Sequence, residues 1–410
     1  MKILLSAFAC DPNSGSEPYV GWNWLKLLSA RHSKLTVLTR RVHQEVLRQA
    51  VEKNQMWNVE FIFFDLPVIG GMGHRGRGIK AYYIAWQVLA YFRVLTYCLT
   101  NRVKVIHHCT YNVVDFPGFL WAIPGSRFVW GPVGGGQCPP EWASRIYGSG
   151  WNRERLRRFI KATIRYNPLV LLGIWRASVV LVANDETLAR IPERFRGKCQ
   201  KMLETAINVP PGRAERIANA SSGQTVRLLW VGQIERRKAV GILLDAISAL
   251  SLRRGSTDGI TVDVIGEGPD MQREIQRAET LGIRSTVNFL GPQPFHKMGD
   301  FYARADMFVF TSVQDTSGNV ILEALSHGLP VVAINHQGAK EILRDGGGLL
   351  VEPENYGKVV EGFSQYIEAA LDGKLDLRGL SEAGLKNISL NHSWSRKGED
   401  IQVIYDEIFS

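Results

Sequence analysis

Residues 307–333 read MFVFTSVQDTSGNVILEALSHGLPVVA, and this stretch decides the fold class. An apolar run at Met307–Thr311 precedes a polar turn, a segment of helical spacing begins near Asn319, and a second apolar run follows at Pro330–Ala333. A strand, a helix and a second strand in this order are typical of a parallel sheet with a crossover helix. The stretch therefore predicts one unit of an α/β domain.

The same alternation recurs on both sides of this unit and falls into two groups, separated by residues 209–224. That stretch contains Pro210, Pro211, Gly212 and the polar run SSGQ, which is typical of a linker. We therefore expect two doubly wound, parallel-sheet α/β domains facing a cleft. The expected boundaries are 1–208 for the first domain, 209–224 for the linker, 225–390 for the second domain and 391–410 for a C-terminal helix that packs back on the first domain.

The expected strands are Lys2–Ser6, Leu35–Thr39, Val59–Phe63, Val103–His107, Arg127–Trp130, Ser178–Val182, Val226–Val231, Thr261–Ile265, Val287–Leu290, Met307–Thr311, Pro330–Ala333 and Gly348–Val351.

Length and composition agree with this organisation. A chain of 410 residues is long enough for two or three domains, and 45% hydrophobic with 21% charged residues is ordinary for a globular protein. The net charge of +10 indicates an anionic partner such as phosphate or lipid headgroups. The five cysteines form no CxxC spacing, so we expect neither a disulfide framework nor a zinc site, and a reducing cytoplasm fits best.

One segment has the length of a membrane span. Tyr82–Leu99 is mostly apolar, but Gln87 and Arg93 interrupt it. Because an Arg at the bilayer centre costs about 2.5 to 3.5 kcal/mol, we expect a buried helix instead. The N-terminal residues hold too few apolar side chains for a signal peptide and predict a first strand.

Ligands of open α/β sheets bind beyond the carboxyl ends of the strands, so the loops at those ends are the candidate sites. The loop Gly232–Lys238 carries a glycine followed by clustered cations, which could clamp a phosphate or form a solvated basic turn. The loop Gly266–Pro269 has the sequence GEGP, in which glycine permits a close backbone approach. Asp315 in the next loop and Glu323 on the following helix could accept hydrogen bonds from sugar hydroxyls. The alternative is that Asp315 caps the helix and Glu323 is solvated.

Taken in order, these segments resemble the retaining GT-B glycosyltransferases of family 4, also called group 1 glycosyltransferases. The matching segments are VGQIERRKAVGILLDAI, DVIGEGPD, VNFLGPQP, MFVFTSVQDTSGNVILEALSHGLPVVA and HQGAKEIL, which together span about Val226–Leu343. In the first half, GSEPYVGWNW and WGPVGGGQCP resemble a subgroup found in bacterial polysaccharide pathways.

The resemblance implies a role for each matching residue. Glu323 would hold the donor ribose, Asp315 would address the donor sugar, and Lys238 would bind the donor diphosphate. The full implied donor set is Glu323, Gly318, Asn319, Gly232, Gln233, Arg237, Gly266, Gly268, Gly15 and Ser16, and the implied catalytic set is Asp315, Lys238, His108 and His107.

Two residues depart from the family pattern. Asp315 stands where the family usually has the longer Glu, which could shift the donor hydroxyl that it holds. Gln233 stands where the family usually has Arg, and Arg236 or Arg237 could replace its charge.

The first half adds candidates on the acceptor side. The family often places a histidine facing the cleft at the end of the strand Val103–His107, and we favour His108 over His107 because neighbouring strand residues point to opposite faces. A structural role is the alternative for either histidine. Further acceptor-side candidates are Glu17, Arg75 and Gly135; the loops that carry Arg75 and Gly135 could equally be simple mobile turns.

Residues 151–166 combine cations with apolar side chains at helical spacing. Such a helix could lie on an anionic membrane surface or pack one face on the core. Because no nucleic-acid-binding signature accompanies the positive charge, we do not expect nucleic acid as a partner.

These features predict a retaining, metal-independent hexosyltransferase. It would move a sugar from a UDP- or GDP-sugar co-substrate to a saccharide or lipid-linked saccharide during synthesis of cell-surface polysaccharide such as lipopolysaccharide, with no metal and no permanently bound cofactor. We expect it in the cytoplasm or on the cytoplasmic face of the inner membrane. The alternatives are a sugar-nucleotide epimerase and a non-catalytic protein that binds sugar or membrane.

Overall fold

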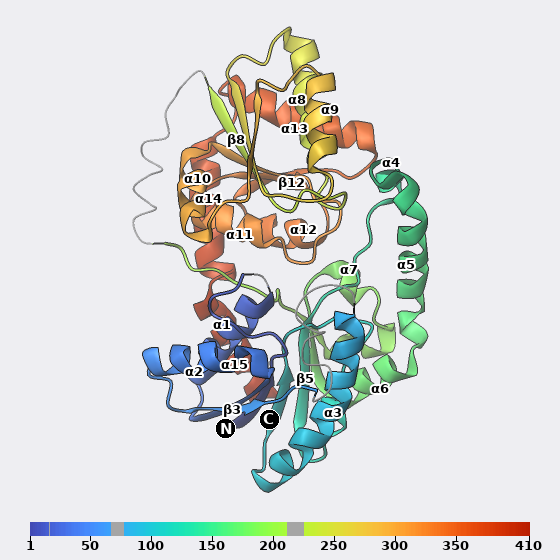
Figure 1. The fold of residues 1–410 in the computed structure, drawn as a ribbon, viewed down its shortest axis with the longest axis vertical. Helices are drawn as coiled ribbons and strands as arrows, with labels where there is room; N and C mark the ends of the chain where they lie inside the picture. The colour runs from blue at the N-terminus through green and yellow to red at the C-terminus, as the bar shows by residue number, and fades with distance from the viewer. Residues whose placement is uncertain (16, 67–77, 211–224) are drawn as a thin grey trace. The chain divides into compact units, whose positions relative to one another are not determined.

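The computed structural model describes residues 1–15, 17–66, 78–210 and 225–410, which form two compact units (Figure 1). Unit 1 comprises Met1–Gly136, Arg158–Thr205 and Gly398–Ser410, and unit 2 comprises Gln137–Arg157 and Ala206–Lys397. The segment Gln137–Arg157, which the sequence places within the first domain, thus packs in unit 2. Most of the expected linker, residues 211–224, lies outside the described residues.

Unit 1 is built on a seven-stranded, all-parallel sheet in the order β3-β2-β1-β4-β5-β6-β7. The central strands are in register, with Ser6 opposite His108 and His108 opposite Trp130. The strands are β1 Lys2–Ser6, β2 Lys34–Thr39, β3 Val59–Phe63, β4 Val105–His108, β5 Arg127–Val133, β6 Ala177–Val182 and β7 Cys199–Lys201.

Helices cover both faces of this sheet. One face carries Ile106, Trp130 and Val180 and packs against α3 and α6. The opposite face packs against α1 and the end of α15, where Trp24 and Tyr405 contact His107. The helices with residues in unit 1 are α1 Glu17–Ser29, α2 Gln44–Lys53, α3 Ile79–Thr100, α5 Trp151–Thr163, α6 Pro168–Arg176, α7 Asp185–Leu188 and α15 Trp394–Glu407; α5 and α15 begin in unit 2.

Unit 2 contains a six-stranded, all-parallel sheet in the order β10-β9-β8-β11-β12-β13. Figure 1 shows α8, α9 and α13 together beside this sheet, and Trp230 and Val264 pack in their core. The strands are β8 Val226–Val231, β9 Ile260–Ile265, β10 Val287–Gly291, β11 Met307–Phe310, β12 Val331–Ile334 and β13 Gly348–Val351. The helices are α4 Ser144–Tyr147, α8 Val240–Arg254, α9 Met271–Thr280, α10 Met298–Arg304, α11 Asn319–Ser326, α12 Gln337–Leu343, α13 Tyr356–Leu371 and α14 Leu377–Asn391.

All the strands that the sequence predicts are present, with ends shifted by no more than a few residues. The largest differences concern β4, which begins at Val105 rather than Val103, and β5, which continues to Val133. The short strand β7, Cys199–Lys201, was not predicted, because its sequence CQK has neither alternation nor a β-branched residue.

The apolar segment Tyr82–Leu99 lies within α3. One side of this helix, including Trp86 and Val94, is buried against the sheet, whereas Phe92 and Leu99 on the other side are exposed. Among the helices that the structure describes, none is long and apolar enough to cross a membrane.

The end of α15 is held by a polar contact inside unit 1. The hydroxyl of Tyr405 lies 2.6 Å from Nδ1 of His107, and Nε2 of His107 lies 2.7 Å from the carbonyl oxygen of Gly131. Both ring nitrogens of this fully buried imidazole therefore have partners. Burial lowers the pKa of His107 to about 4, so the ring is neutral at physiological pH.

We predict that Tyr405→Phe destabilises unit 1. The variant keeps the buried ring but leaves one nitrogen of His107 without its partner, which costs about 1 to 3 kcal/mol. Chemical denaturation measures the loss directly. The matched control is Tyr366→Phe, because the Tyr366 hydroxyl makes only a long, 3.4 Å contact with the carbonyl oxygen of Leu350 and should contribute little. Equal stability of the Tyr405→Phe variant and the unmodified chain would contradict the proposed role of this contact.

Candidate functional site

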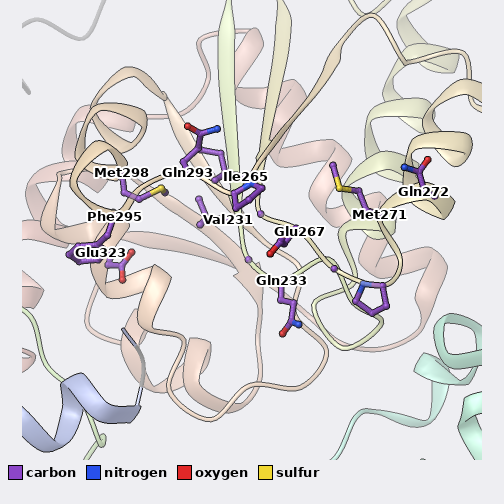
Figure 2. A pocket seen from close by; sticks show the side chains of 15 residues that line it. Val231, Gln233, Ile265, Glu267, Met271, Gln272, Gln293, Phe295, Met298 and Glu323 are labelled. Carbon is purple, nitrogen blue, oxygen red and sulfur yellow. The ribbon is translucent and has the colours of Figure 1, made fainter. Parts of the chain in front are cut away.

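A pocket of about 840 Å³ opens at the carboxyl ends of β8, β9 and β10 in unit 2 (Figure 2). This is the edge at which ligands of parallel sheets bind, and the volume suits a small molecule. The lining residues are Val231, Gly232, Gln233, Ile265, Gly266, Glu267, Gly268, Pro269, Met271, Gln272, Pro292, Gln293, Phe295, Met298 and Glu323.

Two loops join tightly to form one wall of this pocket. Gly266 has φ +133°, and a Cβ atom built on it would lie 1.9 Å from the carbonyl oxygen of Gly232. The loops are also joined by a hydrogen bond of 2.9 Å from the N–H of Ile234 to the carbonyl of Glu267. Glycine is therefore required at 266 for the two strand-end loops to approach each other.

Glu323 brings a carboxylate into the pocket from one turn inside α11. Its Oε2 accepts a hydrogen bond of 2.7 Å from the hydroxyl of Tyr302, and its side chain lies beside Phe295 and Met298 (Figure 2). Burial raises the pKa of Glu323 above its usual value, although the Tyr302 hydrogen bond acts in the opposite direction. A partly desolvated carboxylate with one acceptor site occupied can still accept hydrogen bonds from hydroxyl groups.

A second charged group, the carboxylate of Asp315, lies in the loop between β11 and α11. Lys238 forms an ion pair with Oδ2 of Asp315, and the Lys238 ammonium also lies 5.5 Å from the centre of the Phe310 ring. Oδ1 of Asp315 accepts a hydrogen bond of 3.2 Å from the N–H of Gly318. Burial disfavours the Asp315 carboxylate, but the charges of Lys238 and Arg237 outweigh this effect and hold its pKa below the usual value.

Asp315 has a structural role at the start of α11, as one of the two interpretations of its position predicted, and its contact with a donor sugar stays a prediction. It shapes the start of α11 through Gly318, which has φ +59°, and it is the partner of a cation at the carboxyl end of the sheet. Asn319, the first residue of α11, accepts a hydrogen bond of 3.1 Å from the Ser317 hydroxyl.

The arginines beside Lys238 differ in their surroundings. Arg236 donates to the carbonyl oxygen of Tyr147 and lies 3.8 Å from Asp270, so it is engaged away from Asp315. Arg237 pairs with Glu235 at 2.5 Å and is close enough to lower the pKa of Asp315. Of the two, Arg237 is therefore better placed to supplement Lys238, while Gln233 is exposed at the mouth of the pocket.

The two adjacent histidines of β4 are both fully buried in unit 1. His107 contacts α1 and α15, as described above, whereas Nε2 of His108 lies 2.9 Å from the hydroxyl of Tyr83 on α3. Their opposite orientations follow from the strand geometry. Helices cover both faces of the sheet at this point, and the cleft-facing role expected of His108 stays a prediction. Burial lowers the pKa of His108 to about 3, so this ring is neutral as well.

The remaining first-half candidates that the structure describes belong to unit 1. Oε1 of Glu17 accepts a hydrogen bond of 2.6 Å from the N–H of Tyr111, and burial raises the pKa of this carboxyl group. Gly15 is exposed before α1, and a Cβ atom built on Gly135 would lie 3.4 Å from Cγ1 of Val113. Ser16 and Arg75 lie outside the described residues.

The structure also identifies residues that the sequence did not single out. Tyr302 positions Glu323, and Gln337 accepts a hydrogen bond of 2.8 Å from the N–H of Asp315. The first contact joins two residues that are 21 positions apart in the chain, and the second joins two that are 22 positions apart. Contacts over such separations cannot be predicted from the spacing of residues in a local motif. Within the described part of the chain, no cluster of three or more His, Cys, Asp and Glu side chains is arranged to hold a metal ion.

Helix α5 leaves its apolar side chains exposed. Phe159 and Ile160 are 68% and 51% exposed, and the neighbouring Trp175 of α6 is 60% exposed. Phe159 and Ile160 therefore do not pack on the core, whereas Ile164, which shares their helical spacing, is buried in the core of unit 1.

Comparison with known proteins finds a match to the part of the chain that forms this pocket. Residues 225–369, which include the whole pocket, match the family model described as "Glycosyl transferases group 1". This confirms the group 1 resemblance for the second half of the chain.

Curated relatives match over less than half of their own length. The D-inositol 3-phosphate glycosyltransferase of Salinispora tropica is 32% identical over 188 residues, which are 43% of this chain and 37% of that protein. The lipopolysaccharide core biosynthesis glycosyltransferase LpsE of Rhizobium meliloti is 32% identical over 159 residues, or 38% of this chain and 43% of that protein.

Two solved structures match over almost the full chain. Anabaena Alr3699/HepE in complex with UDP has a TM-score of 0.64 at 15% identity, and the match covers 99% of this chain and 100% of that one. WaaG, a glycosyltransferase involved in lipopolysaccharide biosynthesis, has a TM-score of 0.56 at 17% identity, with 98% and 99% covered. The likeness confirms the predicted GT-B fold with two Rossmann-like domains.

Proposed function

We propose that this protein is a retaining glycosyltransferase of family 4 that transfers a hexose from a UDP- or GDP-sugar to a saccharide or lipid-linked saccharide acceptor in cell-surface polysaccharide synthesis. The observation that carries the proposal is the pocket at the carboxyl ends of β8–β10, which holds the carboxylate of Glu323 within the group 1 sequence match. The UDP complex of Alr3699/HepE and the lipopolysaccharide role of WaaG lend support from the same fold.

The donor would use both charged groups of unit 2. Glu323 accepts hydrogen bonds from the ribose hydroxyls, and the glycine-lined wall accommodates the nucleotide. Lys238, supplemented by Arg237, neutralises the diphosphate, and Asp315 holds the transferred sugar. In this arrangement the protein supplies the countercharge itself, so the proposed transfer is metal-independent.

The chemical step exchanges one bond for another at the anomeric carbon. The bond from this carbon to the diphosphate oxygen breaks, and a bond to the acceptor oxygen forms on the same face. The acceptor proton passes to the departing diphosphate oxygen, so no protein base is needed. Lys238 stabilises the negative charge that grows on this leaving group, and Asp315 keeps the sugar aligned.

The first prediction from this proposal concerns Glu323 and nucleotide binding. Replacing Glu323 by Gln should weaken UDP or GDP binding by about tenfold or more, because hydrogen bonds to charged groups contribute about 1.5 to 3 kcal/mol. The raised pKa means that Glu323 takes up its proton at a higher pH than a free Glu. Affinity of the unmodified chain should therefore decline as the pH falls from about 7 to about 5, relative to the variant.

Calorimetric titration at several pH values measures both effects. Since the nucleotide phosphate titrates identically in both proteins, the difference between the two curves isolates Glu323. Glu279→Gln, at an exposed carboxylate of α9 outside the pocket, is the control and should match the unmodified chain. Equal nucleotide affinity of the Glu323 variant and this control would remove Glu323 from the site.

The second prediction concerns Lys238 and turnover. Lys238→Met removes the charge that opposes the leaving diphosphate and should lower kcat by about a hundredfold, as expected for loss of a preorganised electrostatic contact. The variant also leaves Asp315 unpaired, so Lys238→Met combined with Asp315→Asn should recover stability without recovering turnover. Donor-consumption assays with melting curves test this, with Lys374→Ala at an exposed lysine as control. Near-normal turnover in the Lys238 variant would overturn the assignment.

Product analysis separates transfer from the two alternatives. Thermal-shift screening with UDP, GDP and ADP identifies the nucleotide, since a ligand that binds the folded state raises the melting temperature. Transfer requires an acceptor product, whereas an epimerase would convert the donor without an acceptor. Nucleotide binding with no donor consumption across many acceptors would favour a non-catalytic protein.

The proposal includes docking on an anionic membrane through residues 151–166, at the cytoplasmic face of the inner membrane. Apolar Phe159 and Ile160 are exposed on α5 between the cations Arg158 and Lys161. This is the arrangement in which apolar side chains enter the interface and each cation near anionic lipid contributes about 1 kcal/mol. A lipid-linked acceptor would lie at that surface.

We predict that Phe159→Glu lowers binding to vesicles containing phosphatidylglycerol by about fivefold or more, because it removes apolar contact and adds a repelled charge. Vesicle co-sedimentation measures this, and binding of the unmodified chain should weaken with salt and with neutral phosphatidylcholine vesicles. Trp57→Glu, at a residue 75% exposed in a different part of unit 1, is the control. Equal binding to both vesicle types would contradict the membrane proposal.

A further inference from the structure

The position of Asp315 depends on a side chain that lies outside its own loop. Oε1 of Gln337, the first residue of α12, accepts a hydrogen bond of 2.8 Å from the N–H of Asp315. The amide nitrogen of the same side chain donates to the carbonyl oxygen of Cys138 at 3.0 Å. Gln337 thus connects the Asp315 backbone to the segment Gln137–Arg157, which packs in unit 2.

The same segment holds the loop at two further points. The side-chain amide of Gln137 donates to the hydroxyl of Thr316 at 2.5 Å, and the amide of Gln314 donates to the carbonyl oxygen of Gln137 at 3.2 Å. The residues on either side of Asp315 are therefore tied to Gln137, and Asp315 itself is tied to Gln337. All these contacts are neutral hydrogen bonds.

The backbone of Gln337 indicates that its side chain is needed. Its φ is +52°, a left-handed conformation that costs little for glycine but is strained for a residue with a Cβ atom. The side chain is also 97% buried, being 3% exposed. Strained backbone persists where surrounding contacts hold it, and the two hydrogen bonds of the Gln337 amide described above are among these contacts.

The Gln337 contact and the Lys238 ion pair have different dependence on a bound diphosphate. Gln337 is neutral, whereas the positive charge of Lys238 would be attracted by a phosphate. Donor binding therefore weakens the hold of Lys238 on Asp315. The neutral bond from Asp315 to Gln337 is unaffected by such a charge. Together with the hydrogen bond from the Gly318 N–H, it remains to hold Asp315 while the donor is bound.

We propose that Gln337 is a positioning residue, which holds the backbone of Asp315 so that its carboxylate keeps its place when a diphosphate draws Lys238 away. The proposal rests on the proposed glycosyl transfer for its catalytic consequence. Gln337 lies outside the pocket lining, so nucleotide binding itself should not depend on it.

The decisive variant is Gln337→Gly. Glycine relieves the strained backbone, so the melting temperature should stay within about 3 °C of the unmodified chain, whereas both amide hydrogen bonds are lost. We expect kcat for sugar transfer to fall by between about tenfold and about a hundredfold, because misplacing a group that aligns the substrate costs this much. The Kd for UDP or GDP should change by less than about twofold.

Gln55→Gly is the matched control. Gln55 is also a glutamine with a left-handed backbone, at φ +54°, but it is exposed after α2 in unit 1. This control should keep the kcat and nucleotide affinity of the unmodified chain. Gln337→Met, which keeps the side-chain length and loses the hydrogen bonds, should reproduce the loss in kcat, and it serves as the test if the glycine variant is unstable.

Hydrogen exchange of the peptide that contains residues 312–319 provides a readout without activity. In Gln337→Gly the N–H of Asp315 loses its acceptor, so exchange in this peptide should accelerate, while it stays unchanged in Gln55→Gly. Normal kcat and unchanged exchange in both Gln337 variants would overturn the positioning role. If the unmodified chain itself consumes no donor with any acceptor, the proposed function fails and the catalytic role of Gln337 fails with it. Faster exchange would then show only that Gln337 orders the loop.

Discussion

The ion pair between Lys238 and Asp315 is the constraint on which the site of unit 2 depends. Both side chains are largely buried, with 14% and 16% of their surfaces exposed, and a buried charge without a partner is strongly destabilising. The surroundings satisfy both charges: the Phe310 ring lies beside the ammonium, and the Gly318 N–H donates to the carboxylate. Because this pair fixes the loop before α11, it also fixes where Glu323 enters the pocket one turn later.

The two carboxylates of this loop and helix have opposite environments. Cations hold the pKa of Asp315 below its usual value, whereas burial raises the pKa of Glu323, which has Tyr302 rather than a cation as its partner. Asp315 is thus a charged group among polar partners, whereas Glu323 is a hydrogen-bonding group that lies beside the apolar side chains of Phe295 and Met298. Different environments for paired carboxylates are a common way in which one site assigns two roles.

Much of this organisation could be predicted from local sequence. Alternating apolar runs and helical segments identified the strands of both sheets, because burial on both faces leaves a continuous apolar signal in parallel strands. The rule that ligands bind beyond the carboxyl ends of parallel strands then located Gly232, Gly266 and Glu323, which line the pocket. The contacts of Gln337 and Tyr302 could not be found in this way, since each acts through a partner more than twenty positions away, although Gln337 lies within the matching segment HQGAKEIL.

The sequence by itself determined the two-part α/β organisation and the loops that hold the site, because strand periodicity, glycine and charge are local properties of the chain. The tertiary structure decided which residues share a surface. It buried His107 and His108 under helices on opposite faces of β4, left Phe159 and Ile160 of α5 exposed, and packed Gln137–Arg157 in unit 2. These outcomes depend on which helix covers which face of a sheet, and that is set by contacts between segments far apart in the chain, not by the pattern within any one of them.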